Sequence, residues 1–352
     1  MRYLGNKTRL LGFIGRVLRA RGIRGGRALD PFCGTASVSR ALKRWGFQVT
    51  AGDNLQFACV LARAQVALAA EPDFTALAAH LGLRRAHPQA VLHALERLPP
   101  APGFIHEHYA PDGAAGRMYF TPPNAARIDA VRTALHEWRA AGLVVDDAHD
   151  YLLAALIEGA DRVANTTGVY AAFVKSWQPN ARRPLHLRPP RLVRGHGSSA
   201  HRADALELVR THEPFELLYL DPPYNNRQYV GYYHVPEVIA RGWFDAPLQL
   251  RGKTGLIEDA AQRSDWSSAR RCAAALDELV AAAPCRHIVM SYNAEGLIPE
   301  AKIGQILKTH AAPHTYRRYQ RTYRRYRSDA DGPTRNYRGD TVREYLYCVE
   351  KQ

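Results

Sequence analysis

Residues 221–224 read Asp-Pro-Pro-Tyr and combine the groups that chemistry on the exocyclic amine of a nucleobase would need. Such an amine is a poor nucleophile because its lone pair is delocalised into the ring. The carboxylate of Asp221 and the carbonyl of Pro222 could each accept one amine hydrogen, which would favour a pyramidal, more reactive nitrogen. The prolines stiffen the loop, and the ring of Tyr224 could stack on a base swung out of a duplex. The candidate catalytic residues are therefore Asp221, Pro222, Pro223 and Tyr224.

A second cluster of chemistry-bearing residues lies near the N-terminus, where a short apolar strand ends at Asp30. Gly34 would let a ligand approach the backbone of the turn, and Asp53 ends the next expected strand, where it could accept hydrogen bonds from ribose hydroxyls. A dinucleotide site would need three glycines in the turn, so a ligand without pyrophosphate, such as S-adenosylmethionine, suits it better. Its ammonium group would lie near Asp30. The alternative is a structural turn with a surface aspartate.

The elements that must position these residues alternate between short apolar runs and amphipathic helices, which predicts an α/β fold. The tetrapeptide follows the expected strand at 216–220, at the carboxyl end of that strand. Further strands are expected at 27–30, 48–52, 169–174, 286–292 and 344–349, and helices at 36–45, 55–70, 125–141, 148–162 and 299–310.

Several segments together resemble a known family, the alpha-class, Dam-like adenine methyltransferases of DNA, and within it the FokI-type modification methylases. Residues 2–7 and 30–34 are similar to the family's cofactor motifs, 201–205 to its adenine-binding motif and 221–224 to its catalytic motif. The stretch 225–229, with Tyr233, His234 and Glu237, and the stretch 165–170 are similar to the FokI-type branch. The expected cofactor-binding residues are Tyr3, Lys7, Asp30, Phe32, Gly34, Asp53, Asn54 and Asp204.

The resemblance implies a Rossmann-like S-adenosylmethionine-dependent methyltransferase fold with a mixed, mainly parallel seven-stranded sheet. The catalytic domain would comprise residues 1–70 and 191–352, and an inserted, mainly helical target-recognition region would span about 71–190. It also implies S-adenosyl-L-methionine as cofactor, double-stranded DNA as substrate and a cognate restriction endonuclease as partner. The chain departs from the family at Ala36, where a second glycine is common.

The charge of the chain suits a polyanionic partner: the net charge is +15 and the isoelectric point about 9.8. A basic host proteome or solubility could also produce this balance. Tyrosines and arginines alternate over 316–327, which favours DNA contact, although the tyrosines would also line one face of a packed helix. The candidate DNA-binding residues are Tyr109, Tyr119, Arg227, Arg318, Arg321 and Arg324, with packing as the alternative for the two tyrosines.

Other classes of protein are disfavoured. The five cysteines are scattered without a CxxC pair, and His106 and His108 lack further ligands, so we expect no structural metal. Without a long apolar stretch or a leader, we expect a cytoplasmic protein with no membrane contact. An RNA adenine or DNA cytosine amino-methyltransferase, or a catalytically inert nucleic-acid-binding protein of the same fold, are the alternatives to adenine methylation in DNA.

Overall fold

The centre of the molecule is a seven-stranded sheet, seen in a computed structural model that describes residues 1–257, 263–324 and 341–352. Its strand order is β3-β2-β1-β4-β7-β9-β8, with five parallel strands and with β9 and β8 antiparallel to their neighbours. The mixed, mainly parallel α/β sheet confirms the predicted fold class. The strands are β1 (Gly26–Asp30), β2 (Phe47–Asp53), β3 (Ser199–Arg202), β4 (Phe215–Leu220), β7 (Cys285–Asn293), β8 (Arg317–Arg324) and β9 (Thr341–Glu350).

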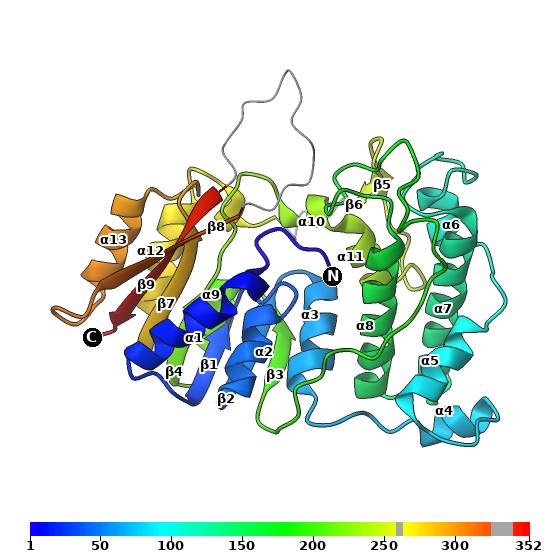
Figure 1. Ribbon diagram of the computed structural model, residues 1–352, viewed down its shortest axis with the longest axis horizontal. Helices are drawn as coiled ribbons and strands as arrows, with labels where there is room; N and C mark the ends of the chain where they lie inside the picture. Colours follow the sequence, from blue (N-terminus) through cyan, green and yellow to red (C-terminus); the bar gives the residue numbers. More distant parts are fainter. Residues whose placement is uncertain (258–262, 325–340) are drawn as a thin grey trace.

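Helices cover both faces of this sheet (Figure 1), which explains why its inner strands are continuous apolar runs. In β4, the run from Leu217 to Leu220 is fully buried. One face packs against α1 (Leu11–Ala20), α2 (Ser37–Arg44) and α3 (Gln56–Ala62), the other against α9 (Ala205–Thr211), α12 (Cys272–Ala282) and α13 (Glu300–Thr309).

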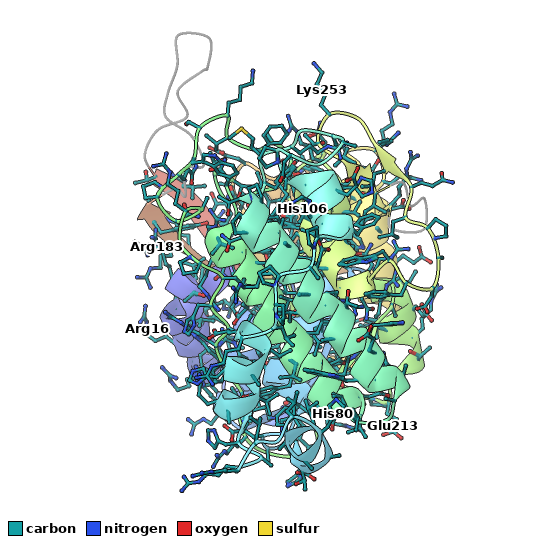
Figure 2. The ribbon with its side chains drawn as sticks, turned by 90° about the vertical axis from the view of Figure 1, so that its right-hand side faces the viewer. Arg16, His80, His106, Arg183, Glu213 and Lys253 are labelled. Atoms are coloured by element: carbon teal, nitrogen blue, oxygen red, sulfur yellow. The ribbon has the colours of Figure 1, made fainter. Side chains whose placement is uncertain are left out.

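A layer of helices extends the molecule beyond β3 and lies to the right in Figure 1. It contains α4 (Thr75–His80), α5 (Pro88–Glu96), α6 (Phe104–Tyr109), α7 (Pro122–Ala140) and α8 (Asp146–Val163). Seen from the side, His106 on α6 and Lys253 lie toward one end of this layer, and His80 on α4 lies toward the other (Figure 2).

The helical layer does not form a core of its own. Helix α8 packs on α3 and on α11 (His234–Arg241), and one hydrophobic cluster unites Phe57, Leu152 and Val238. The segment 71–190, predicted as an insertion, is helical in its first part, but it shares its core with the segments before and after it. The short elements beside it are α10 (Tyr229–Tyr232), the hairpin strands β5 (Leu250–Arg251) and β6 (Leu256–Ile257), and the 3-10 turn η4 (Asp265–Ser267).

Most predicted elements are confirmed with end shifts of one to three residues, and three predictions need correction. The segment 169–174 is not a strand, because it folds back so that the Val174 amide donates to the Asn165 carbonyl at 3.0 Å. The helix predicted over 55–70 ends at Ala62 and continues only as a π-helical turn, η2 (Arg63–Ala67). The tyrosine-arginine segment forms strand β8, so the helical alternative is wrong for its described part. Strand β3 was not predicted, since its residues Ser199–Arg202 are polar and half exposed.

None of the helices in the described ranges is long and apolar enough to cross a membrane. Over the same residues, no three histidine, cysteine or acidic side chains are grouped as metal ligands would be.

Candidate active site

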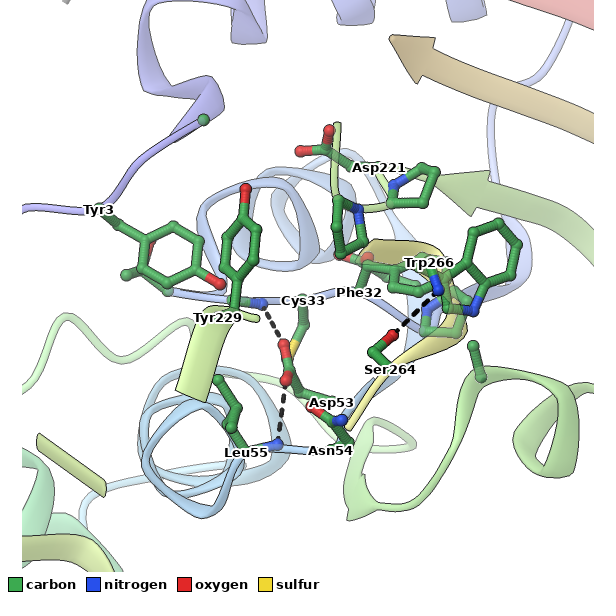
Figure 3. A pocket seen from close by; sticks show the side chains of 18 of the residues that line it. Tyr3, Phe32, Cys33, Asp53, Asn54, Leu55, Asp221, Tyr229, Ser264 and Trp266 are labelled. Carbon is green, nitrogen blue, oxygen red and sulfur yellow. Dashed lines mark hydrogen bonds between the residues drawn. The ribbon is translucent and has the colours of Figure 1, made fainter. Parts of the chain in front are cut away.

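A pocket of about 900 Å³, its open mouth included, lies at the carboxyl ends of β1, β2 and β4. This is the edge of a parallel α/β sheet where ligands bind, and the volume is that of a small-molecule site. All the expected cofactor-binding and catalytic residues line it, so segments nearly 220 residues apart in the chain meet here (Figure 3).

The turn after β1 has the backbone conformation that its sequence suggested. Gly34 has φ +51°, and a Cβ atom there would lie 2.8 Å from the ring of Tyr3. Its amide donates to Asp53 Oδ2 at 3.0 Å, and the Leu55 amide donates to Oδ1 at 3.0 Å. Asp53 therefore fixes the turn through its carboxylate, and each oxygen keeps a lone pair for a further donor. Burial raises the pKa of Asp53 to about 6.

Asp30 is 1% exposed and is only half satisfied. Ser39 Oγ donates to its Oδ2 at 2.5 Å, whereas Oδ1 has no hydrogen-bond partner in the described structure. Burial raises the pKa of Asp30 to about 7, against the lowering effects of Ser39 and the nearby Phe32 backbone. A buried acceptor without a donor, at the wall of a pocket, fits a cationic ligand group.

Part of the pocket wall consists of aromatic residues from two separate loops. The rings of Phe32 and Trp266 meet edge to face with centroids 4.8 Å apart. The loop carrying Trp266 is held by a double hydrogen bond, since Gln228 Nε2 donates to the Ser264 carbonyl and the Ser264 amide donates to Gln228 Oε1. Asp204 caps α9 by accepting from the Leu206 amide at 2.8 Å.

Trp266 and Ser264 are pocket residues that the sequence did not predict. They lie in a polar stretch far from any recognised motif, and their only sequence signal is a lone tryptophan. Gln228 and Tyr229 fell within a recognised stretch but had no assigned role; both line the pocket.

The tetrapeptide begins at the end of β4, where Asp221 lies against the N-terminal segment. Lys7 Nζ is 2.9 Å from Asp221 Oδ1 and 2.8 Å from Glu344 Oε1. Burial raises the pKa of Asp221 to about 6, while Lys7 lowers it. A Cβ atom on Gly5, whose φ is +82°, would lie 3.0 Å from the ring of Tyr224. Lys7, expected as a cofactor residue, thus lines the pocket while pairing with Asp221 of the Asp-Pro-Pro-Tyr loop.

The N-terminal segment is anchored to the helical layer. Arg2 donates to the carbonyls of Asp161 and Thr166 at 2.7 and 2.8 Å. Tyr3 stacks on Tyr233 with centroids 4.6 Å apart, and the Tyr233 hydroxyl accepts from the Leu4 amide at 2.6 Å. The pocket wall formed by Tyr3 therefore depends on contacts with α8 and on the residue that precedes α11.

The predicted DNA-binding residues are not brought together. Tyr109 and Tyr119 are fully buried, and their hydroxyls donate to the carbonyls of Gly255 and Tyr170. The prediction that these rings enter a duplex is wrong, because core packing and two buried hydrogen bonds occupy them.

The predicted arginines lie in different settings. Arg318 pairs with Glu300 and lies over the ring of Tyr345 at 5.0 Å. Arg321 is half-buried on β8, and Arg227 is exposed in the loop after the tetrapeptide. The side chain of Arg324 and residues 325–327 lie outside the described residues. His106 pairs with Asp112 at 3.1 Å, and His108 packs on Phe104.

A mainly parallel seven-stranded sheet, with a ligand pocket at the strand ends beside an Asp-Pro-Pro-Tyr loop, defines a Rossmann-like methyltransferase. Residues 3–292 match the model of the D12 class N6 adenine-specific DNA methyltransferases, and the chain belongs to this family. Its class of reaction is therefore the site-specific transfer of a methyl group to the N6 amine of adenine in DNA.

Individual relatives agree with this assignment. The chain is 33% identical to the type II methyltransferase M.FokI of Planomicrobium okeanokoites over its full length, but spans 53% of that protein. It is 34% identical to the type II methyltransferase M.NlaIII of Neisseria lactamica, with 100% of this chain and 99% of the relative covered. The modification methylase LlaI of Lactococcus lactis subsp. lactis is 31% identical over 93% of this chain and 51% of its own length.

Proposed function

We propose that the chain takes its methyl group from S-adenosylmethionine and transfers it to an adenine that has been swung out of double-stranded DNA into the pocket. The observation that carries this proposal is the unpartnered Oδ1 atom of buried Asp30, at the wall of the pocket that the turn at Gly34 also lines. The donor's ammonium would bind Asp30, its ribose Asp53, and its adenine the walls formed by Phe32, Trp266 and Asp204.

The catalytic loop would act on the adenine amine. When bound, S-adenosylmethionine supplies an electrophilic methyl group on sulfur. Asp221 and the carbonyl of Pro222 accept the two amine hydrogens and direct the nitrogen lone pair toward the methyl carbon. Tyr224 stacks on the base, with its ring supported by Gly5. After transfer, the amine proton leaves by way of Asp221 and solvent.

The DNA would lie across the pocket mouth, with Arg227 close to the extruded base. The helical layer and the loops around residues 71–190 would read the recognition sequence, since helix α8 holds the N-terminal segment whose Tyr3 forms part of the pocket wall. A cognate restriction endonuclease that cuts the same site when unmethylated would be the partner, as expected for a type II modification enzyme.

The test is methyl transfer from labelled S-adenosylmethionine to duplex DNA, followed by nucleoside analysis. We expect N6-methyladenine, and we expect Asp221→Asn to slow transfer by more than about a hundredfold because one acceptor is replaced by a poorer one. Thermal melting of the variant serves as the folding control. Full activity of a folded Asp221→Asn enzyme would contradict the mechanism. N4-methylcytosine, or methylation of structured RNA alone, would contradict the substrate.

A further inference from the structure

Behind the tetrapeptide lies a buried cluster of three charged side chains. The ammonium of Lys7 lies between the carboxylates of Asp221 and Glu344, and the side chains of Lys7 and Glu344 are only 2% and 1% exposed. With all three ionised, the cluster carries a net charge of minus one. Lys7 comes from the 3-10 turn η1 (Lys7–Leu10), Asp221 from the end of β4 and Glu344 from β9.

Glu344 is held firmly inside the sheet. Ser291 Oγ on β7 donates to its Oε1 at 2.6 Å, and the Tyr323 hydroxyl on β8 lies 3.5 Å from its Oε2. Removing a carboxylate from water costs several kcal/mol, so a buried apolar residue of similar size would serve folding at least as well. The position of Glu344 therefore suggests a role beyond stability.

The geometry shows what this role can be. If Lys7 paired with Asp221 alone, its positive charge would offset the negative charge of that carboxylate. Asp221 would then be a weaker acceptor for the amine hydrogens. With Glu344 on its other side, the ammonium divides its donors between two carboxylates. Asp221 then keeps a fixed orientation through Oδ1 and retains more negative charge.

We propose that Glu344 is a positioning residue for methyl transfer, which holds Lys7 so that Lys7 orients Asp221 without neutralising it. Glu344 lies behind Lys7 and is not among the residues that line the pocket. The proposal rests on the proposed acceptor role of Asp221.

The electrostatics of the cluster predict a change in the pKa of Asp221 that would not occur if Glu344 served only to stabilise the fold. Glu344 raises the pKa of Asp221 and Lys7 lowers it, so loss of the Glu344 charge should lower the pKa of Asp221. Six of the other groups that face the cluster are tyrosines whose pKa values burial raises, and they stay neutral below pH 10. The seventh is Asp30, which is present in every variant. The facing groups are Tyr3, Tyr219, Tyr224, Tyr229, Tyr323, Tyr347 and Asp30.

The experiment measures single-turnover methyl transfer to duplex DNA as a function of pH for Glu344→Gln, which keeps the size of the side chain. We expect a transfer rate constant about tenfold or more lower at pH 8, with the KM values for S-adenosylmethionine and DNA within about threefold of wild type. The acid limb of the profile should move to lower pH. Glu350→Gln, on the same strand but in a partly exposed pair with Arg21, is the matched control and should leave rate and profile unchanged.

A folded Glu344→Gln enzyme with the wild-type rate constant and an unshifted acid limb would overturn the proposal. If Glu344→Gln does not fold, Ser291→Ala decides: it loosens Glu344 without removing its charge, and a full rate constant there would also overturn the proposal. The variant Asp221→Asn distinguishes a failure of the proposed function from a failure of this inference. An active Asp221→Asn enzyme defeats the proposed function and this inference together, whereas a normal Glu344→Gln enzyme beside an inactive Asp221→Asn enzyme defeats only the inference.

Discussion

Two regions of the molecule bury carboxylates for different purposes. In the helical layer, Asp129 of α7 accepts hydrogen bonds from the amides of Gly103, Ile105 and His106 at 2.7 to 2.9 Å, and so caps the start of α6. At the pocket edge, Asp30 is as deeply buried, yet one of its oxygens has no partner in the described structure. A satisfied carboxylate belongs to the scaffold. A half-satisfied one leaves binding energy for a ligand.

The largest effect should come from breaking the satisfied carboxylate. Asp129→Ala leaves three amides without this acceptor, one of them buried and two part-buried, and we expect it to lower the free energy of unfolding by about 2 kcal/mol or more. Chemical denaturation measures this loss. Asp129→Asn, which keeps one acceptor oxygen, should lose less. An unchanged denaturation midpoint in Asp129→Ala would show that the two carboxylates do not differ as described.

The same type of change at the pocket edge should act on binding instead. Asp30→Asn removes a buried charge with an unpartnered oxygen, so the free protein at pH 8 should be at least as stable as wild type. Its affinity for S-adenosylmethionine should fall about tenfold or more, since a hydrogen bond between two charged groups is lost. Calorimetric titration measures the affinity; equal affinities would refute the assignment of Asp30 to the ammonium.

The pH dependence of Asp30 sharpens this contrast. Its pKa in the folded protein is raised to about 7 from an ordinary 3.8, so the folded state holds the proton more tightly than the unfolded chain. Asp30 therefore weakens stability progressively as the pH rises from about 4 to about 7, with no further change above. Binding should tighten toward pH 7, because the ionised form binds the ammonium. The difference in affinity between wild type and Asp30→Asn should grow from pH 5.5 to 7; a constant difference would contradict this account.

The smallest effect concerns the turn between Asp30 and helix α2. Ala36 has φ +56° and ψ 25°, a left-handed conformation that costs a residue with a Cβ atom about 1 kcal/mol. Ala36→Gly should therefore stabilise the protein by up to about 1 kcal/mol, measured by denaturation, with activity retained. The matched control is Ala274→Gly at an exposed position of α12, which should destabilise by about 0.5 to 1 kcal/mol. Destabilisation by both changes would mean that the turn is not strained.

The sequence by itself determined the fold class and the pocket residues that lie in its recognised motifs, but not Trp266 and Ser264. Apolar runs ending at Asp30, Asp53 and Leu220 predicted parallel strands, and parallel strands place their carboxyl ends at one edge whatever the loops between them do. The departure at Ala36 was also visible in the sequence. The reason for a glycine at this position was not visible, because only the backbone shows that residue 36 has a positive φ.

Tertiary structure alone decided the contacts between segments that are distant along the chain. Glu237, which the sequence marked without a role, accepts from the amides of Gln56 and Phe57 at 3.1 Å and so caps α3. For Tyr109 and Tyr119 the sequence left both DNA contact and core packing open, with packing the commoner role of such aromatic residues, and only the tertiary structure places them in the core. Glu344 gave no signal at the start of its predicted strand, and its pairing with Lys7 arises because β9 enters the sheet beside β7. The local sequence pattern determines which face of an element is apolar. The partner of a buried charge depends instead on the topology, which brings together segments that are distant along the chain.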